Sequence, residues 1–326
     1  MEKVPSPGQS SNRLCYDHEK TEMTGNQHID PIVSVVIPVY NRTEELKRAI
    51  SSVLNQTFQN FELLIVDDGS DDDIKSVCNF FGDPRIKYIR NDEHVNANKA
   101  RNTGILQSRG VYIAMLDSDD EFLSCHLERR LIKMKEWGCE GIFGSAYIVD
   151  EIGKRLQISR PMYPGEKMVD YLLSDGFAAT PTHFYNLQAV KDILWDDTFE
   201  CHQDFDFSIR FSEKYRFVSD FEPTVVVHWE KKELNISNLD SCLKFIEKYR
   251  SSISPKNYCN YHRGMYYLMA FSGDRKYVKH FARNSYKYIR EVSFNDFLFV
   301  HGRKRKYKVS LLIKFFLLHI YYFLRK

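Results

Sequence analysis

Three carboxylates end an apolar run in the segment GVYIAMLDSDDEF, residues 110–122, at positions Asp117, Asp119 and Asp120. Carboxylates this close together raise one another's pKa and destabilise a fold unless a counter-charge faces them. A divalent cation supplies that charge, and carboxylate oxygens suit Mg²⁺ or Mn²⁺. From these residues alone a solvated acidic loop is an equal alternative, as is an acidic cap on a helix that begins near Ser124.

The elements that must position these acids alternate between two hydrophobic periods. Short apolar, β-branched runs typical of buried strands occupy residues 32–39, 61–66, 85–90, 111–116 and 141–150. Helical spacing of apolar residues occupies 41–56, 96–110 and 126–137. We expect Asn41 or Thr43 to cap the first helix and Gly110 to end the second.

Strands that alternate with helices predict an α/β fold with a doubly wound, mostly parallel sheet. Ligands bind such sheets beyond the carboxyl ends of the strands. Three polar sets follow strand ends here, at Tyr40-Asn41, at Asp67-Asp68 and at the acids after residue 116, so we expect them along one edge of the sheet. Neither GxGxxG nor GxxxxGK[ST] occurs, which excludes a dinucleotide fingerprint and a Walker phosphate loop.

Composition sets broad limits on the protein class. The chain has 326 residues, 43% hydrophobic, with a net charge of +2, which excludes global disorder and gives no indication of a nucleic-acid partner. The seven cysteines are odd in number, widely spaced and without a CxxC pair. We therefore expect neither a disulfide framework nor a zinc site, but free thiols in a reducing compartment. The polar N-terminus does not resemble a signal peptide, which favours the cytoplasm.

Four motifs in order carry a family resemblance. The chain reads strand-IPVYNR-helix, strand-VDDGS, a helix with ARNTGI, and strand-LDSDDEF. This order resembles the nucleotide-binding half of the inverting GT-A glycosyltransferases of family 2, closely over residues 32–150 and more loosely to about residue 240. The resemblance implies a GT-A fold, with a smaller C-terminal helical region. It also implies metal-dependent transfer of one sugar from a nucleotide-sugar donor, most of all a UDP-sugar, to a hydroxyl of a glycan or lipid-linked glycan.

The resemblance implies a nucleotide pocket built from the first two motifs. Pro38, Val39 and Tyr40 would line the base and ribose. Asp68 would accept a hydrogen bond from the uracil ring, and Asp67 would help to shape the pocket. The chemistry agrees, because the uracil N3–H is a donor and a carboxylate is an acceptor.

The other two motifs are implied to hold the diphosphate. Arg101 would lie near the base and phosphates, and Asp119 would bind Mn²⁺ or Mg²⁺. Asp117, with Ser118 beside it, would approach the ribose or reach the metal through water, whereas the role of Asp120 stays open. A metal and an arginine would stabilise the charge that develops on the leaving diphosphate.

The general base is implied in WDDTFECHQDFDFSIRF, residues 195–211. Relatives carry a Glu-Asp pair here, and this chain reads Gln203-Asp204, which puts the acceptor geometry in doubt. Asp204 aligns with the base. Asp206 lies about 200° around the helix, so only one of the two can face a cleft. Without the resemblance, Asp204 is an acid placed favourably at a helix N-terminus.

Weaker matches lie on the acceptor side. Thr182 and His183 belong to TPTHFY, which in relatives borders the acceptor and donor sugar. His228, in VVVHWEKKELNISN, would complete the metal shell or contact a phosphate, with a structural histidine as an equal alternative. Trp229 fits sugar stacking or core packing. No QxxRW follows the base, which favours single-sugar addition.

The expected organisation has three parts. Residues 1–30 form a polar disordered tail, residues 31–238 the catalytic domain, with a nucleotide-binding half at 31–150 and an acceptor half at 151–238, and residues 239–326 a helical region. A basic stretch precedes an apolar run at 309–324, which predicts a helix on an anionic membrane surface at the inner face of the plasma membrane. Docking of this helix on the protein, or in a homodimer, is the alternative.

Two other functions fit parts of the pattern. A nucleotidyltransferase uses a similar sheet and metal acids, but it should carry a glycine-rich basic loop after the first strand, which PVYNRTEEL lacks. A catalytically silent sugar-nucleotide-binding module would keep Asp68 and Asp119 without needing Asp204.

Overall fold

The computed structural model describes residues 30–229, 236–269, 277, 279–281, 283 and 284. The predicted N-terminal tail, except Asp30, and the predicted membrane-associating helix lie outside these residues. In the part of the chain that is described, every helix is too short or too polar to cross a bilayer.

The first half alternates strands and helices as predicted. Its elements are β1 (Val33–Val39), α1 (Thr43–Leu54), β2 (Phe61–Asp67), α2 (Ile74–Phe81), β3 (Ile86–Arg90), α3 (Ala97–Gln107) and β4 (Tyr112–Met115). The second half is less regular and contains β5 (Glu121–Phe122), α4 (His126–Trp137), β6 (Gly141–Gly144), β7 (Ala146–Asp150), β8 (Gly153–Gln157), α5 (Met168–Leu173), the 3₁₀ turn Thr180–Thr182, β9 (Phe184–Asn186), α6 (Leu187–Ile193), α7 (Gln203–Lys214), β10 (Phe217–Asp220) and β11 (Val225–His228). Two helices follow, α8 (Ile236–Lys248) and α9 (Pro255–Met269).

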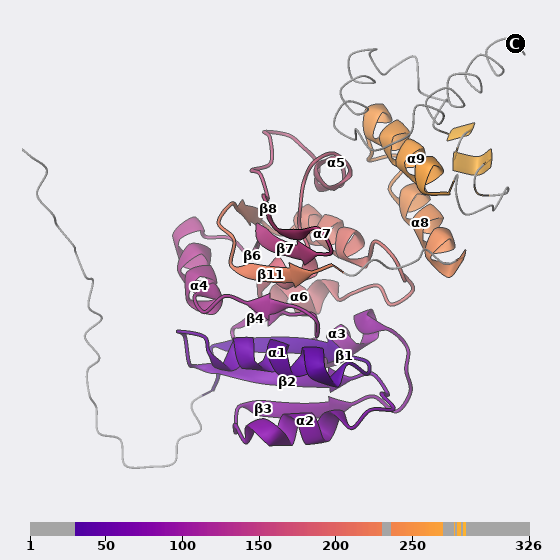
Figure 1. Cartoon of the computed structure of the whole chain (residues 1–326). Coiled ribbons are helices and arrows are strands. Elements are labelled where there is room, and N and C mark those ends of the chain that lie inside the picture. Colours follow the sequence, from indigo (N-terminus) through magenta and orange to yellow (C-terminus); the bar gives the residue numbers. More distant parts are fainter. Residues whose placement is uncertain (1–29, 230–235, 270–276, 278, 282, 285–326) are drawn as a thin grey trace, which may run out of the picture. The chain divides into compact units, whose positions relative to one another are not determined.

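A seven-stranded sheet in the order β10-β6-β9-β4-β1-β2-β3 forms the centre of the fold, and its pairs are parallel except those of β9 (Figure 1). The mostly parallel sheet is therefore confirmed. The short strand β9 lies antiparallel between β4 and β6 and joins the two halves of the chain in one sheet. A second sheet, in the order β5-β11-β7-β8, carries the end of the acidic loop.

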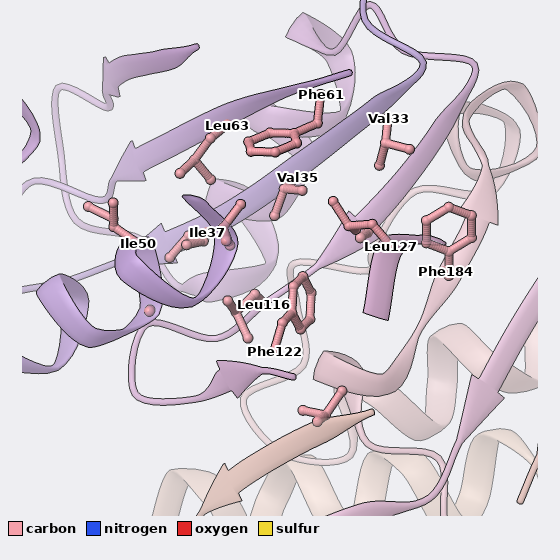
Figure 2. Packing of buried hydrophobic residues seen from close by; sticks show 14 of the residues in the cluster. Val33, Val35, Ile37, Ile50, Phe61, Leu63, Leu116, Phe122, Leu127 and Phe184 are labelled. Atoms are coloured by element: carbon pink, nitrogen blue, oxygen red, sulfur yellow. The ribbon is translucent and has the colours of Figure 1, made fainter. Parts of the chain in front are cut away.

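Both faces of the large sheet are buried, which explains why β1 is apolar at nearly every position. Val33, Val35 and Ile37 lie on one face, where they pack with Ile50 of α1 and with side chains of α2 and α4 (Figure 2). Val36 lies on the other face, in a cluster that α3, α6 and α7 contribute to. Helices thus cover the sheet on both sides, as a doubly wound fold requires.

Three local expectations were wrong. The N-cap residue of α1 is Arg42, in the left-handed region at φ 68°, and no side chain caps the helix. Asn41 Oδ1 instead accepts hydrogen bonds from the amides of Asp71 and Asp72. The helix α3 ends at Gln107 rather than at Gly110. Residues 141–150 form two strands rather than the one expected. The first, β6, pairs in the large sheet, and the second, β7, pairs in the small one.

Candidate active site

A cavity of about 800 Å³ opens at the carboxyl ends of β1, β2 and β4. All three polar sets that follow these strands contribute to its wall, as the doubly wound topology predicts. Of the predicted site residues, the following line the cavity: Pro38, Val39, Tyr40, Asp68, Arg101, Asp117, Ser118, Asp119, Gln203, Asp204 and His228.

Asp68 presents a fixed carboxylate at one end of the cavity. Its Oδ1 accepts from Asn91 Nδ2 at 2.9 Å, and its Oδ2 accepts from the amide of Val95 at 3.1 Å. The ring of His94, which lies 2.9 Å from Oδ2, stacks on the exposed ring of Tyr40 at 3.8 Å between centroids. The result is an acceptor beside an aromatic surface, which suits a planar base with a ring N–H.

Asp67 is fully buried and does not line the cavity. It accepts hydrogen bonds from Tyr88 Oη at 2.6 Å, from Arg90 at 2.6 Å and from the amide of Ser70 at 2.8 Å. Gly69 follows at φ 80°, where a Cβ would lie 2.8 Å from the amide nitrogen of His94. The DDGS motif therefore fixes a tight turn that aims Asp68 at the cavity.

The acids after β4 are paired with arginines from other elements. Asp117 Oδ1 accepts from Arg101 Nη2 at 2.6 Å, and the buried Arg101 guanidinium also lies over the ring of Trp195. The Asp119 carboxylate forms an ion pair with Arg42, and its carbonyl oxygen accepts from Arg48 at 2.6 Å. Cationic side chains thus balance the negative charge at the strand end.

Asp120 has a structural environment. It is 3% exposed, and its carboxylate accepts from the amide of His228 at 2.8 Å, which ties the acidic loop to β11. Burial, with the nearby charges of Asp117 and Asp119, raises its pKa well above the usual range. The ring of His228 contacts Glu121 at 2.8 Å.

The acids after β4 offer the hard oxygen ligands that a divalent cation needs. Among the residues that the structure describes, Asp117, Asp119 and His228 do not bring three ligand atoms within 4.8 Å of one another. Mg²⁺ needs only one or two carboxylates when substrate phosphates supply the other oxygens. Asp119 presents a carboxylate to the cavity, so the residues present fit a hard cation whose remaining ligands are substrate phosphates and water.

The helix α7 begins at the cavity. The two acids of its first turn, Asp204 and Asp206, point in different directions, as the helical period predicts. Asp204 is half-buried and lines the cavity, where burial raises the pKa of its carboxyl. Asp206 points away and accepts from Arg210 at 2.8 Å, from Lys248 at 2.6 Å and from Tyr249 Oη at 2.7 Å. Only Asp204 of this pair is therefore available to a bound substrate.

The TPTHFY segment lies differently from the sequence expectation. Thr182 and His183 are fully buried and do not line the cavity, whereas Thr180 and Pro181 before them do. The His183 ring is held by Ala178 O at 3.0 Å and by Tyr185 Oη at 2.7 Å, and burial lowers its pKa to about 3. These two side chains therefore lie behind the cavity wall, whereas the start of the same segment lines the cavity.

Sequence reasoning missed several cavity residues. Arg42 lies within the quoted PVYNR motif, so its charge was a visible signal, but its left-handed backbone was not. His94 and Val95 lie in a loop without a regular pattern, and no sequence signal marked them. The exposed ring of Trp229 also lines the cavity, which favours its sugar-stacking interpretation over core packing.

Comparisons with known proteins identify relatives of this chain. The family model described as glycosyl transferase family 2 matches residues 34–198. An uncharacterized glycosyltransferase of Rickettsia bellii is 45% identical over 129 residues, 39% of this chain and 19% of that protein. WfgD of Escherichia coli, named as a UDP-Glc:alpha-D-GlcNAc-diphosphoundecaprenol beta-1,3-glucosyltransferase, is 37% identical over 121 residues, 37% of this chain and 48% of WfgD. The chain thus spans about a fifth of the first relative and about half of the second.

The crystal structure of S. aureus TarS 1-349 in complex with UDP-GlcNAc superimposes with a TM-score of 0.53 at 19% identity. The match covers 87% of this chain and 78% of that one. At this identity the likeness concerns the fold, and it confirms the GT-A architecture that the motif order implied.

Proposed function

The chain belongs to glycosyl transferase family 2, and from this premise we propose that it transfers one sugar from a nucleotide-sugar donor to a hydroxyl group of a glycan or lipid-linked glycan. A UDP-sugar is the proposed donor, in line with the names of WfgD and of the TarS complex. The observation that carries the proposal is one cavity that Asp68, Asp119 and Asp204 all line.

The nucleotide end of the cavity supports a uracil-containing donor. Asp68 would accept the uracil N3–H, and Tyr40 would lie against the base. The Asp68 carboxylate is already held by Asn91 and Val95, so little side-chain entropy would be lost when the donor binds.

The diphosphate would lie near the acids and arginines after β1 and β4. Mn²⁺ or Mg²⁺, held by Asp119 with Asp117 and His228 nearby, would supply positive charge to the leaving diphosphate. Arg42 pairs with Asp119 in this structure and would turn to the phosphates as the donor binds. Arg101 keeps Asp117 in place through its 2.6 Å contact.

The transfer itself would be a single in-line displacement with inversion. The acceptor oxygen attacks the anomeric carbon, the bond from that carbon to the diphosphate oxygen breaks, and the hydroxyl proton passes to Asp204. A base works best when its pKa approaches the working pH. Burial raises the pKa of Asp204, which therefore favours this role.

Replacement of Asp204 tests the proposal. Asp204→Asn should lower transfer by about 10²–10⁴-fold, the range typical of a lost general base, while UDP binding changes little. The matched control is Asp197→Asn, an exposed carboxylate in the loop before α7 that does not line the cavity. The assay combines purified full-length protein, Mn²⁺ or Mg²⁺ and a panel of nucleotide sugars, with thermal shift, donor hydrolysis and transfer as readouts.

Each function gives a different pattern in this assay. Intact transfer in Asp204→Asn would show that another group is the base. A wild-type protein that binds UDP but neither hydrolyses nor transfers any donor would be a silent binding module. A response that does not depend on the metal would overturn the role of Asp119.

A further inference from the structure

Two cysteines and a histidine from different elements meet beside the candidate active site, and we call them the Cys–His–Cys cluster. Cys201 and His202 precede α7, and Cys242 lies in α8, 41 residues after Cys201. The Sγ atom of Cys242 lies 3.6 Å from Sγ of Cys201 and 3.5 Å from Nδ1 of His202. Cysteine spacing along the chain gave no hint of this cluster, because the fold creates it.

The backbone and its neighbours hold the three side chains in place. His202 lies in the left-handed region at φ 61°, and its ring stacks on Phe245 of α8 at 4.9 Å between centroids. Ser241 Oγ accepts from the amide of Cys201 at 3.0 Å and donates to its carbonyl oxygen at 3.1 Å. Non-glycine residues seldom adopt such a conformation, and those that do concentrate at functional sites.

The distances match those between ligands of a tetrahedral zinc ion. With Zn–S near 2.3 Å and Zn–N near 2.0–2.1 Å, two sulfurs lie about 3.8 Å apart, and a sulfur and a nitrogen lie about 3.6 Å apart. The observed 3.6 Å and 3.5 Å agree with these values to about 0.2 Å. The stronger indication of a metal is that three ligand atoms of the kinds that zinc prefers lie within 4.8 Å of one another.

We infer that Cys201, His202 and Cys242 form a binding site for a thiophilic divalent cation of the zinc class. Two thiolates and a neutral imidazole balance the charge of such an ion, so the site can lie in this mostly buried place without a net charge. Among the described residues these three are the possible ligands that lie close together. A tetrahedral ion would therefore keep a fourth position for water or another ligand.

The position of the cluster gives the ion a structural effect on the active site. Glu200 and Gln203, on either side of the two ligands, both line the cavity. A bound ion would tie the loop before α7 to α8 and so fix the start of the helix that carries Asp204. The site is separate from the acidic one, because thiolates select zinc over Mg²⁺ whereas carboxylates suit Mg²⁺ and Mn²⁺.

Cobalt titration tests the inference without measuring transfer. The full-length protein, reduced and stripped of metal by a chelator, is titrated with Co²⁺. We expect one equivalent to produce thiolate-to-cobalt charge-transfer absorption and the intense visible bands of a tetrahedral ion. Zn²⁺ should displace these bands, and a large excess of Mg²⁺ should not. Zn²⁺ should also raise the midpoint of thermal unfolding.

Three variants assign the bands to the cluster. Cys201→Ser, Cys242→Ser and His202→Asn should each weaken Co²⁺ binding at least about tenfold. His202→Asn is chosen because asparagine tolerates the left-handed backbone, which guards against misfolding. Cys125→Ser, at an exposed cysteine outside the cluster, is the matched control and should bind Co²⁺ like the wild type.

Three outcomes would overturn the inference. One is reduced protein that gives no thiolate bands with Co²⁺. Another is a set of bands that all three cluster variants retain. The third is a Cys201–Cys242 disulfide that forms in air when one equivalent of Zn²⁺ is present, because this would make the pair a redox couple with O₂ as its oxidant.

Discussion

At the residue scale, we expect Asp68 to be the residue that selects the base of the nucleotide. Its carboxylate is held by the amide of Val95 and the side chain of Asn91, so its orientation does not depend on the ligand. A uracil N3–H would find a charged acceptor there, whereas cytosine has an unprotonated N3 and would meet a carboxylate with no proton between them.

We therefore predict that Asp68→Ala reduces the affinity for UDP at least about tenfold, the effect of losing a hydrogen bond to a charged group worth about 1.5–3 kcal/mol. CDP affinity should change much less, so that the preference for UDP over CDP shrinks. Calorimetric titration of both nucleotides measures this preference. Asp71→Ala is the control, because it removes an exposed carboxylate from the same loop that does not line the cavity. An unchanged preference in Asp68→Ala would place the base elsewhere.

The sequence predicted which residues lie at the same edge of the sheet, but it predicted fewer of the contacts that each side chain makes. Asp68, Asp117 and Asp119 could be placed at one edge because each follows a strand of a parallel sheet. The buried contact of Asp120 with His228 could not, since it depends on β11, 108 residues further along the chain. The same holds for Arg42, whose ion pair with Asp119 requires a backbone conformation that its residue type does not predict.

At the element scale, the buried carboxylate of Asp206 links α7 to α8. Asp206 of α7 is 1% exposed and binds Lys248 at the end of α8, Tyr249 directly after it, and Arg210 of its own helix. The helical period alone predicted that Asp206 turns away from Asp204. The partners on α8 were beyond prediction, because no pattern in the sequence pairs two helices.

Asp206→Asn should lower the free energy of unfolding by about 1.5–3 kcal/mol, the value of a hydrogen bond that involves a charged group. The loss stays in this range because Arg210 and Lys248 are partly exposed and water can solvate them. Urea unfolding followed by circular dichroism measures the change. Glu213→Gln, at an exposed acid of the same helix, should have almost no effect. Equal stability of the two variants would refute the role of Asp206.

At the scale of the whole molecule, three buried histidines make stability depend on pH. Burial lowers the pKa of His183 to about 3 and of His262 to about 4, and burial near Arg130 lowers the pKa of His126 well below its usual value. An unfolded histidine titrates near 6.5. Below about pH 6.5 these histidines bind protons in the unfolded chain and not in the folded chain, so the stability that they contribute is greatest above this pH and is lost on acidification.

Each such histidine contributes up to about 1.4 kcal/mol per pH unit between the unfolded and folded pKa values. We predict that the free energy of unfolding, measured in urea, decreases as the pH falls from about 6.5 to 5. Each of the three histidines should contribute up to about 1.4 kcal/mol per pH unit. His183→Gln should remove the contribution of one proton, up to about 1.4 kcal/mol per pH unit, from this dependence. The fold should persist, since glutamine can keep both hydrogen bonds. A slope that His183→Gln does not alter would contradict the assignment.

The strand β9 has a consequence for how this protein can be divided. Residues 31–150 contain β4 and β6, but these strands do not pair with each other, because β9 from residues 184–186 fills the space between them. A truncated polypeptide that ends at residue 150 would lack both β9 and β10, which leaves one edge of β4 and both edges of β6 unpaired. Such edges invite intermolecular pairing and aggregation. The shortest fragment that could remain monomeric must extend beyond residue 186, although every nucleotide-binding motif lies before residue 123.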